Sequence, residues 1–198
     1  MNKLRRQFLS AATVVVAAVP RTSNAQHAPK TARGPILLTV SGLIGVGNRG
    51  PIDPALDKMM SKQMIKFDRA YAFDFAALLA LPSVTIKPTL EYDNKVHTLR
   101  GPLVVDVMKA CAVKMHSKIS LFMRAVDGYA AQVSAVDVEK YRYIVATHID
   151  GQPMALGGLG PLWGIYDADR FSNMVSKPVA ERFVTCPWAT YHIEVKES

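Results

Sequence analysis

The sequence predicts a single α+β domain over residues 35–198, with mostly antiparallel or mixed strand pairing and short helices. Two observations support this fold class. The β-rich runs are short, and the helical patterns are scattered among them rather than alternating with them. In addition, no internal repeat and no sharp change in composition divides the chain. The 173 residues from 26 to 198 suffice for one domain with a substantial core.

Local signals set the order of the elements. Asp74 is a suitable N-cap residue, Pro102 suits a first helical position, and Asp127-Gly128 is a strong turn signal. The glycines at 42–50 lack the Gly-Lys-Ser/Thr ending of a phosphate-binding loop, so we interpret them as turns. The expected elements are a strand at 36–40, a helix at 75–81, strands at 84–92 and 96–99, a helix at 101–112, strands at 119–126 and 129–133, a helix at 136–141, strands at 143–149 and 162–166, a helix at 179–183 and a strand at 191–195.

Residues 1–25 match the pattern of a cleavable signal peptide. A cationic start, an apolar stretch at 8–19 and the small residues Ser23-Asn24-Ala25 follow one another. The apolar stretch is too short to cross a hydrocarbon core of about 30 Å, although a retained anchor is the alternative. Residues 26–34 are polar and predict a flexible leader. We therefore expect export to the periplasm.

The export route has two interpretations. Arg5-Arg6 followed by Phe8-Leu9 resembles a twin-arginine signal, and Arg21 after the apolar stretch fits that route. The alternative is the general secretory (Sec) route, because cationic residues are common at the start of any signal peptide.

The charge pattern argues against nucleic acid as a partner. The formal net charge of +8 falls to +4 for residues 26–198, because the predicted signal carries four cationic residues and no acidic one. No basic run or nucleic-acid motif remains. The two cysteines, Cys111 and Cys186, form no disulfide framework, and the pattern leaves open whether they are paired.

Four short segments together resemble the molybdopterin-binding domain of the sulfite-oxidase type. Their order and spacing match that family from about residue 36 to 195, which implies its fold for nearly the whole domain. The segments are Ala80-Leu81-Pro82, Val96 to Leu103, Val126-Asp127-Gly128-Tyr129, and Asp150 to Met154 leading to Gly160-Pro161-Leu162-Trp163.

One departure from this family concerns the metal ligand. The family's enzymes bind molybdenum through a cysteine thiolate, but the matching region, residues 88–93, contains none. Cys111 and Cys186 lie elsewhere in the sequence, and the phenol of Tyr92 is a poor substitute for a soft thiolate. The resemblance in fold therefore does not extend to the redox chemistry.

Small exported proteins of this fold that lack the cysteine resemble periplasmic pterin-binding regulators. The resemblance implies a reduced, monapterin-like pterin as ligand and the periplasmic region of a membrane signalling protein as partner. That partner would be a diguanylate cyclase/phosphodiesterase that controls cyclic-di-GMP and biofilm formation. The alternative is a molybdenum-cofactor-dependent oxidoreductase, or an accessory subunit of one, with molybdopterin as cofactor. The paired arginines favour this alternative, and a structural accessory domain is a third possibility.

A pterin is a flat, polar bicycle, so it needs an aromatic face for stacking and a carboxylate for its amino-pyrimidinone edge. Trp163 follows a glycine-rich loop, and Tyr92 lies near the position of the missing cysteine. Core packing, turn formation and solvated surface positions are the structural alternatives for these residue types. The expected ligand-binding residues are Trp163, Tyr92, Glu91, Arg100, Arg124, Asp127, Tyr129 and Asp150.

The sequence offers no recognisable catalytic or metal-binding set. The five histidines show no metal-ligand spacing, and no Ser-His-Asp or Cys-His arrangement can be recognised. We therefore name no catalytic residue and no metal ligand.

Overall fold

The computed structural model describes residues 34–198. The predicted signal peptide and the leader up to residue 33 lie outside the described residues. The strands are β1 (Ile36–Gly42), β2 (Ala70–Asp74), β3 (Ser83–Ile86), β4 (Leu99–Pro102), β5 (Ile119–Ala125), β6 (Ala130–Ser134), β7 (Ile144–Ala146), β8 (His148–Ile149), β9 (Gln152–Pro153), β10 (Trp163–Ile165) and β11 (Thr190–Glu197). The helices are α1 (Lys58–Lys62), α2 (Phe75–Leu79), α3 (Val104–Ala110), α4 (Ala135–Lys140) and α5 (Ser172–Val175), with 3-10 turns η1 (Ala168–Arg170) and η2 (Val179–Glu181).

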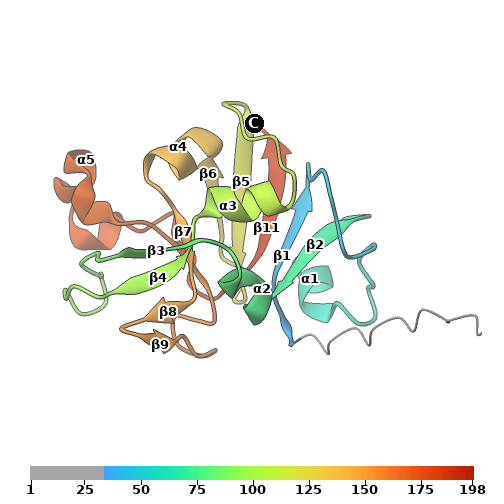
Figure 1. Cartoon of the computed structure of the whole chain (residues 1–198), viewed down its shortest axis with the longest axis horizontal. Helices are drawn as coiled ribbons and strands as arrows, with labels where there is room; N and C mark the ends of the chain where they lie inside the picture. Colours follow the sequence, from blue (N-terminus) through green and yellow to red (C-terminus); the bar gives the residue numbers. More distant parts are fainter. Residues whose placement is uncertain (1–33) are drawn as a thin grey trace, which may run out of the picture. The chain divides into compact units, whose positions relative to one another are not determined.

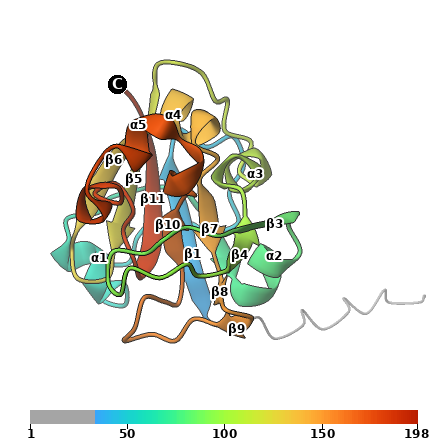
Figure 2. The same cartoon turned by 90° about the vertical axis from the view of Figure 1, so that its left-hand side faces the viewer.

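The strands form three sheets, which confirm the α+β class and the mostly antiparallel pairing (Figure 1). The largest sheet has the order β2-β1-β11-β5-β6, and only its β1–β11 pair is parallel. A four-stranded sheet has the order β3-β4-β8-β9, and β10 pairs with β7. Figure 2 shows α1 on one side of the domain and α2, α3 and β3 on the other.

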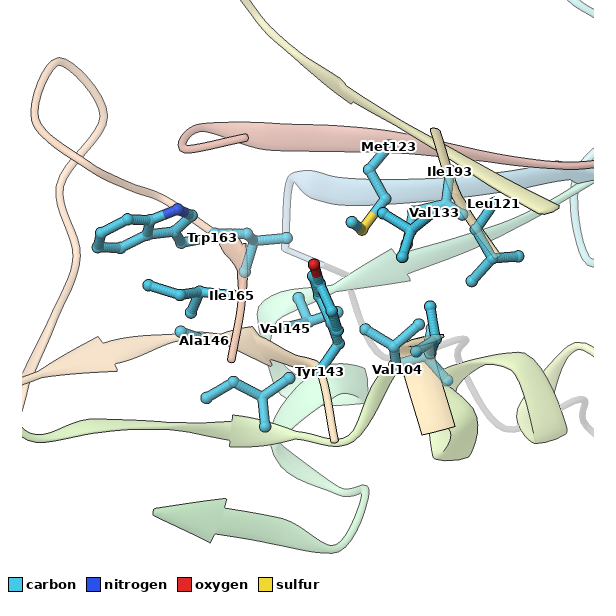
Figure 3. Close-up of a cluster of buried hydrophobic side chains, with 14 of the residues drawn as sticks. Val104, Leu121, Met123, Val133, Tyr143, Val145, Ala146, Trp163, Ile165 and Ile193 are labelled. Atoms are coloured by element: carbon cyan, nitrogen blue, oxygen red, sulfur yellow. The ribbon is translucent and has the colours of Figure 1, made fainter. Parts of the chain in front are cut away.

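The main core lies between the largest sheet and the β7–β10 pair. Strand β1 buries four consecutive residues, Leu38 to Ser41, and β5 buries Leu121, Met123 and Ala125 as well as its first two residues, so both strands are covered on their two faces. Figure 3 shows side chains of β5, β6 and β11 facing those of β7 and β10, with Val104 of α3 closing the cluster. Burial of this apolar surface is the main stabilising term for the fold.

Two helix caps follow from their sequences. The Asp74 carboxylate accepts a hydrogen bond from the Ala77 amide at 2.7 Å, which confirms the predicted cap of α2. Ser134 caps α4 in the same way, through the Asp137 amide at 3.0 Å. None of the described helices is long and apolar enough to cross a membrane.

The prediction that a helix begins at Gly101-Pro102 is wrong. These residues end strand β4, and α3 begins at Val104. Gly101 lies so close to β7 that an added Cβ would be 1.9 Å from the Val145 carbonyl oxygen. The glycine therefore serves the close approach of two strands, a contact between distant segments that no local pattern reveals.

Candidate ligand-binding cleft

Two adjoining pockets form one cleft at the surface of the domain. Their volumes are about 270 Å³ and 650 Å³, and they share Tyr92, Asp127 and Trp188, so we name them together the Tyr92–Trp188 cleft. The larger pocket falls in the range of roughly 300–1,000 Å³ that small-molecule sites occupy. The smaller pocket is also lined by Glu91, Ala125, Tyr129, Ala180, Phe183, Val184, Cys186 and Pro187, and the larger by Val126, Leu156, Gly157, Gly158, Leu159 and Ala189.

Four segments that are distant in sequence build this cleft. They are the loop that follows β3, the turn between β5 and β6, the loop 156–159 that precedes β10, and the segment 180–189 that leads into β11. The Tyr129 hydroxyl donates a hydrogen bond to the Val184 carbonyl, which fastens the turn to the segment. The cleft is thus held by contacts across the fold rather than by one local motif.

Tyr92 and Trp188 are the two aromatic residues that line both pockets. Tyr92 is 55% exposed, so much of its ring is accessible to a ligand. Trp188 is partly buried and lines both pockets. Such rings can stack on a flat heterocycle.

Glu91 and Asp127 supply the negative charge of the cleft. Asp127 Oδ1 accepts a hydrogen bond from the Tyr129 amide at 2.9 Å, which orients the carboxylate. In the described part of the chain, neither carboxylate forms an ion pair with a lysine or arginine. Burial, and then the Glu91 charge, raise the pKa of Tyr92 to about 12, so the phenol is neutral at physiological pH.

Trp163 lies in the core and does not line either pocket, contrary to our expectation. It is 1% exposed, and its Nε1 donates a hydrogen bond to the Cys186 carbonyl at 2.9 Å. Its ring centroid is 6.3 Å from that of Tyr92, so it lies behind the cleft wall. The physical reason is that β10 pairs with β7 inside the core, which turns this large side chain inward.

Trp188 is the cleft residue that the sequence reasoning missed. It sits in a Cys-Pro-Trp segment without a glycine-rich neighbour, and the family motifs do not include it. The only available signal was its residue type, because just two tryptophans occur in the chain.

Besides Trp163, three expected site residues lie outside the lining of the cleft. Arg124 pairs across strands with β11, where its guanidinium is 2.9 Å from the Glu194 carboxylate. Arg100 donates from Nε to the Ser83 hydroxyl at 2.9 Å, between neighbouring strands. Asp150 occupies the β8–β9 turn with a φ of 48°, which agrees with turn formation, the structural alternative to ligand binding for this residue.

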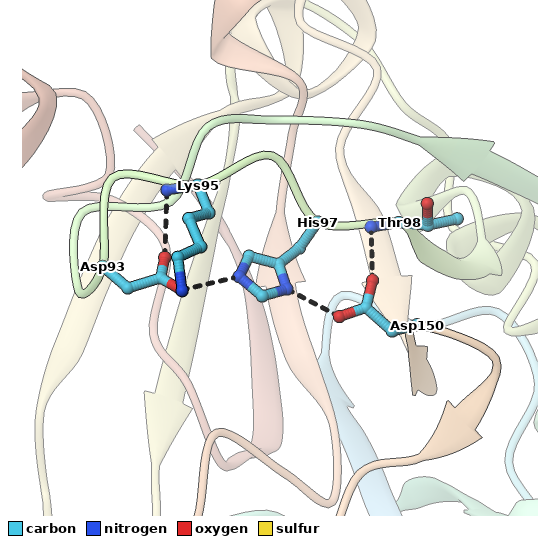
Figure 4. Close-up of polar contacts among 5 residues, drawn as sticks. All are labelled: Asp93, Lys95, His97, Thr98 and Asp150. Atoms are coloured by element: carbon cyan, nitrogen blue, oxygen red, sulfur yellow. Dashed lines mark hydrogen bonds and ion pairs between the residues drawn. The ribbon is translucent and has the colours of Figure 1, made fainter.

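Asp150 nevertheless contacts His97, which lies between the Asp150 and Asp93 carboxylates (Figure 4). His97 Nδ1 is 2.6 Å from the Asp150 carboxylate, and its Nε2 is 3.1 Å from the carboxylate of Asp93. The second Asp150 oxygen accepts from the Thr98 amide at 2.9 Å. Since Asp93 directly follows Glu91 and Tyr92, this bridge ties the cleft loop to the β8–β9 turn.

The two cysteines are buried and free. Cys186 lines the smaller pocket, and burial raises the pKa of its thiol well above the ordinary range and that of Cys111 to about 12. Both thiols are therefore protonated at physiological pH. Within residues 34–198, no group of three His, Cys, Asp or Glu side chains could hold a metal ion. Residues 88–93, where the family that the sequence resembles carries its ligand cysteine, offer the neutral phenol of Tyr92 instead, a donor that does not fit molybdenum held by a thiolate.

The α+β fold is similar to that of a solved enzyme structure. The sulfane dehydrogenase SoxCD from Paracoccus pantotrophus superimposes with a TM-score of 0.52 at 11% sequence identity. The match covers 81% of this chain and 38% of that chain, so this chain spans well under half of its length. No model of a protein family and no curated protein matches the sequence. At this identity the likeness shows the fold alone.

Proposed function

We propose that this protein is a binding module that holds a flat, pterin-like heterocycle in the Tyr92–Trp188 cleft. The observation that carries the proposal is that the aromatic side chains of Tyr92 and Trp188 and the carboxylates of Glu91 and Asp127 line one cleft. A reduced, monapterin-like pterin fits this chemistry.

Each part of the cleft has a role in this proposal. Tyr92 and Trp188 stack on the bicycle, an interaction worth about 1–3 kcal/mol when a nucleic-acid base stacks on an aromatic side chain. Glu91 and Asp127 accept hydrogen bonds from the amino-pyrimidinone edge, which a carboxylate makes stronger than a neutral acceptor does. The small residues Gly157 and Gly158 leave room for the ligand at the larger pocket.

We extend this proposal to a signalling role in the periplasm. The ligand state of the cleft would be read by the periplasmic region of a membrane-bound diguanylate cyclase/phosphodiesterase. The predicted signal peptide and the resemblance to pterin-binding regulators support this step. Leu156 and Val184 add exposed apolar surface at the cleft, which a partner could contact.

The direct experiment is a calorimetric titration of the purified protein with a reduced pterin. We expect saturable binding at one site, weakened by about 10-fold or more in Trp188→Ala. Phe122→Ala, which removes an aromatic ring from the middle of β5, is the matched control and should bind as the wild type does. Absence of binding to the wild type contradicts the proposal.

The second candidate function is a molybdenum-cofactor-dependent oxidoreductase, or an accessory subunit of one. The likeness in fold to a sulfane dehydrogenase favours it. Elemental analysis of protein purified from a cofactor-producing host separates the two functions. One molybdenum per chain would favour the second function, and none would favour the binding module.

A further inference from the structure

We infer that the Tyr92–Trp188 cleft selects its ligand by charge: it takes a neutral or cationic heterocycle and rejects forms that carry a phosphate. This inference rests on the proposed function, because it specifies which members of the pterin class the same cleft accepts. Glu91 and Asp127 are the residues that set the selectivity.

Within residues 34–198, the lining of the cleft carries acidic side chains and no basic ones. Among the described residues that line the two pockets, no lysine, arginine or histidine occurs. The charged groups are the carboxylates of Glu91 and Asp127, and Tyr92 is a neutral phenol. A phosphate in this cleft would meet negative charge without a counter-ion, which opposes binding.

The two arginines that adjoin lining residues in the sequence form ion pairs outside the lining. Arg182 precedes the lining residue Phe183, yet its guanidinium contacts the Asp169 carboxylate at 2.9 Å and the carbonyls of Lys177 and Val175. Arg124 precedes the lining residue Ala125 and pairs with Glu194. Recruiting either side chain to a bound phosphate would first break these contacts.

Lys95 is the lysine nearest in sequence to Tyr92 of the cleft loop. Lys95 follows the cleft loop, and its ammonium is 3.9 Å from the carboxylate of Asp93 rather than in the lining. Its side chain is 76% exposed, so water and salt screen its charge. The field inside the cleft is therefore set by the two carboxylates.

This selectivity distinguishes two ligands that share a ring system. A free pterin with a polyol side chain presents hydrogen-bond donors and no anion. Molybdopterin and its nucleotide forms carry phosphate. The same ring would stack equally well in both, so the charge of the cleft decides between them.

The experiment compares a reduced pterin with its phosphate monoester on the intact protein. We expect the ester to bind at least about 10-fold more weakly. Glu91→Gln and Asp127→Asn should lower the ratio of the dissociation constant of the ester to that of the free pterin. Added salt should lower this ratio too. An ester that binds as tightly as the free pterin, or more tightly, overturns the inference and leaves the proposed function standing. If neither ligand binds, the proposed function fails and this inference fails with it.

A gain-of-function pair gives a second readout. Val184→Lys places a cation on the lining at an exposed valine, whereas Val136→Lys places one on α4, away from the cleft lining; the two valines are 59% and 51% exposed. We expect only Val184→Lys to improve ester binding, by several-fold, with little change for the free pterin. Equal improvement in both variants would show a general charge effect and overturn the inference.

Discussion

His97 Nδ1 lies 2.6 Å from the Asp150 carboxylate, and this contact joins two loops that are 53 residues apart in sequence. Hydrogen bonds that His97 donates to Asp150 and then to Asp93 raise the pKa of His97, and the pKa values of both aspartates are lowered. The bridge therefore favours the charged imidazolium between two carboxylates.

The first prediction is a pH-dependent contribution of this bridge to folding. Since the pKa of His97 is raised in the folded state, its contribution is present below the unfolded value of about 6.5 and is lost as pH rises through the folded value. The free energy of unfolding of wild type and His97→Gln, measured with urea, should differ most near pH 5.5 and least near pH 9. A difference that grows with pH would contradict the bridge.

The second prediction concerns His192, whose pKa is lowered in the folded protein, so its effect on stability depends on pH in the opposite direction. Burial, and then Arg124, lower the pKa of His192 to about 3, and its Nε2 is 2.9 Å from the Ser41 hydroxyl. The folded protein thus excludes a proton that the unfolded chain accepts, so stability falls as pH drops from about 6.5 toward 3. The full effect of His192 on the free energy of unfolding is about 5 kcal/mol, because one pKa unit corresponds to about 1.4 kcal/mol.

The measurement for His192 is the same urea titration on His192→Gln, between pH 4 and pH 7. The variant loses packing at every pH, but it should show a flatter pH dependence than the wild type. Parallel curves for the two proteins would show that His192 does not titrate as the structure indicates.

The third prediction separates the two tryptophans. Trp163→Ala removes a buried side chain and a hydrogen bond, and should destabilise the fold by about 3–5 kcal/mol. Trp188→Ala should cost far less stability but weaken ligand binding. Urea unfolding and calorimetric titration of both variants test this assignment. The reverse pattern would place the ligand at Trp163.

The fourth prediction concerns thiol reactivity. Because burial raises the pKa values of Cys111 and Cys186, neither should react with a thiol-specific reagent in the folded protein at pH 8. Both should react after denaturation. Rapid labelling of Cys186 in the native state would show a reactive thiolate beside the cleft and reopen the question of metal binding.

Local signals predicted much of the fold. The cap at Asp74, the turn at Asp127-Gly128 and the strand at 36–40 each depend on neighbouring residues, and the structure confirms them. The β4–β7 approach at Gly101 depends on residues more than 40 positions apart, so the sequence suggested a helix start instead. Long-range contacts leave no periodic trace in a single sequence.

The sequence predicted only part of the cleft, because the positions of its other residues depend on long-range contacts. Glu91, Tyr92, Asp127 and Tyr129 do line it. Asp127 and Tyr129 belong to a segment of the family resemblance, whereas Glu91 and Tyr92 lie in residues 88–93, where the family's cysteine is missing. Trp163 was expected there from a glycine-rich neighbour, but strand pairing turns it inward. The position of Trp188 depends on how segment 180–189 folds back over the β5–β6 turn, which only the three-dimensional arrangement reveals.

The most direct test of the central claim is a titration of the purified protein with a reduced pterin, performed in parallel on Trp188→Ala. The account predicts one binding site in the wild type and an affinity lowered by about 10-fold or more in the variant. No binding to the wild type, or equal affinity in both proteins, would contradict the assignment of the Tyr92–Trp188 cleft as the ligand site.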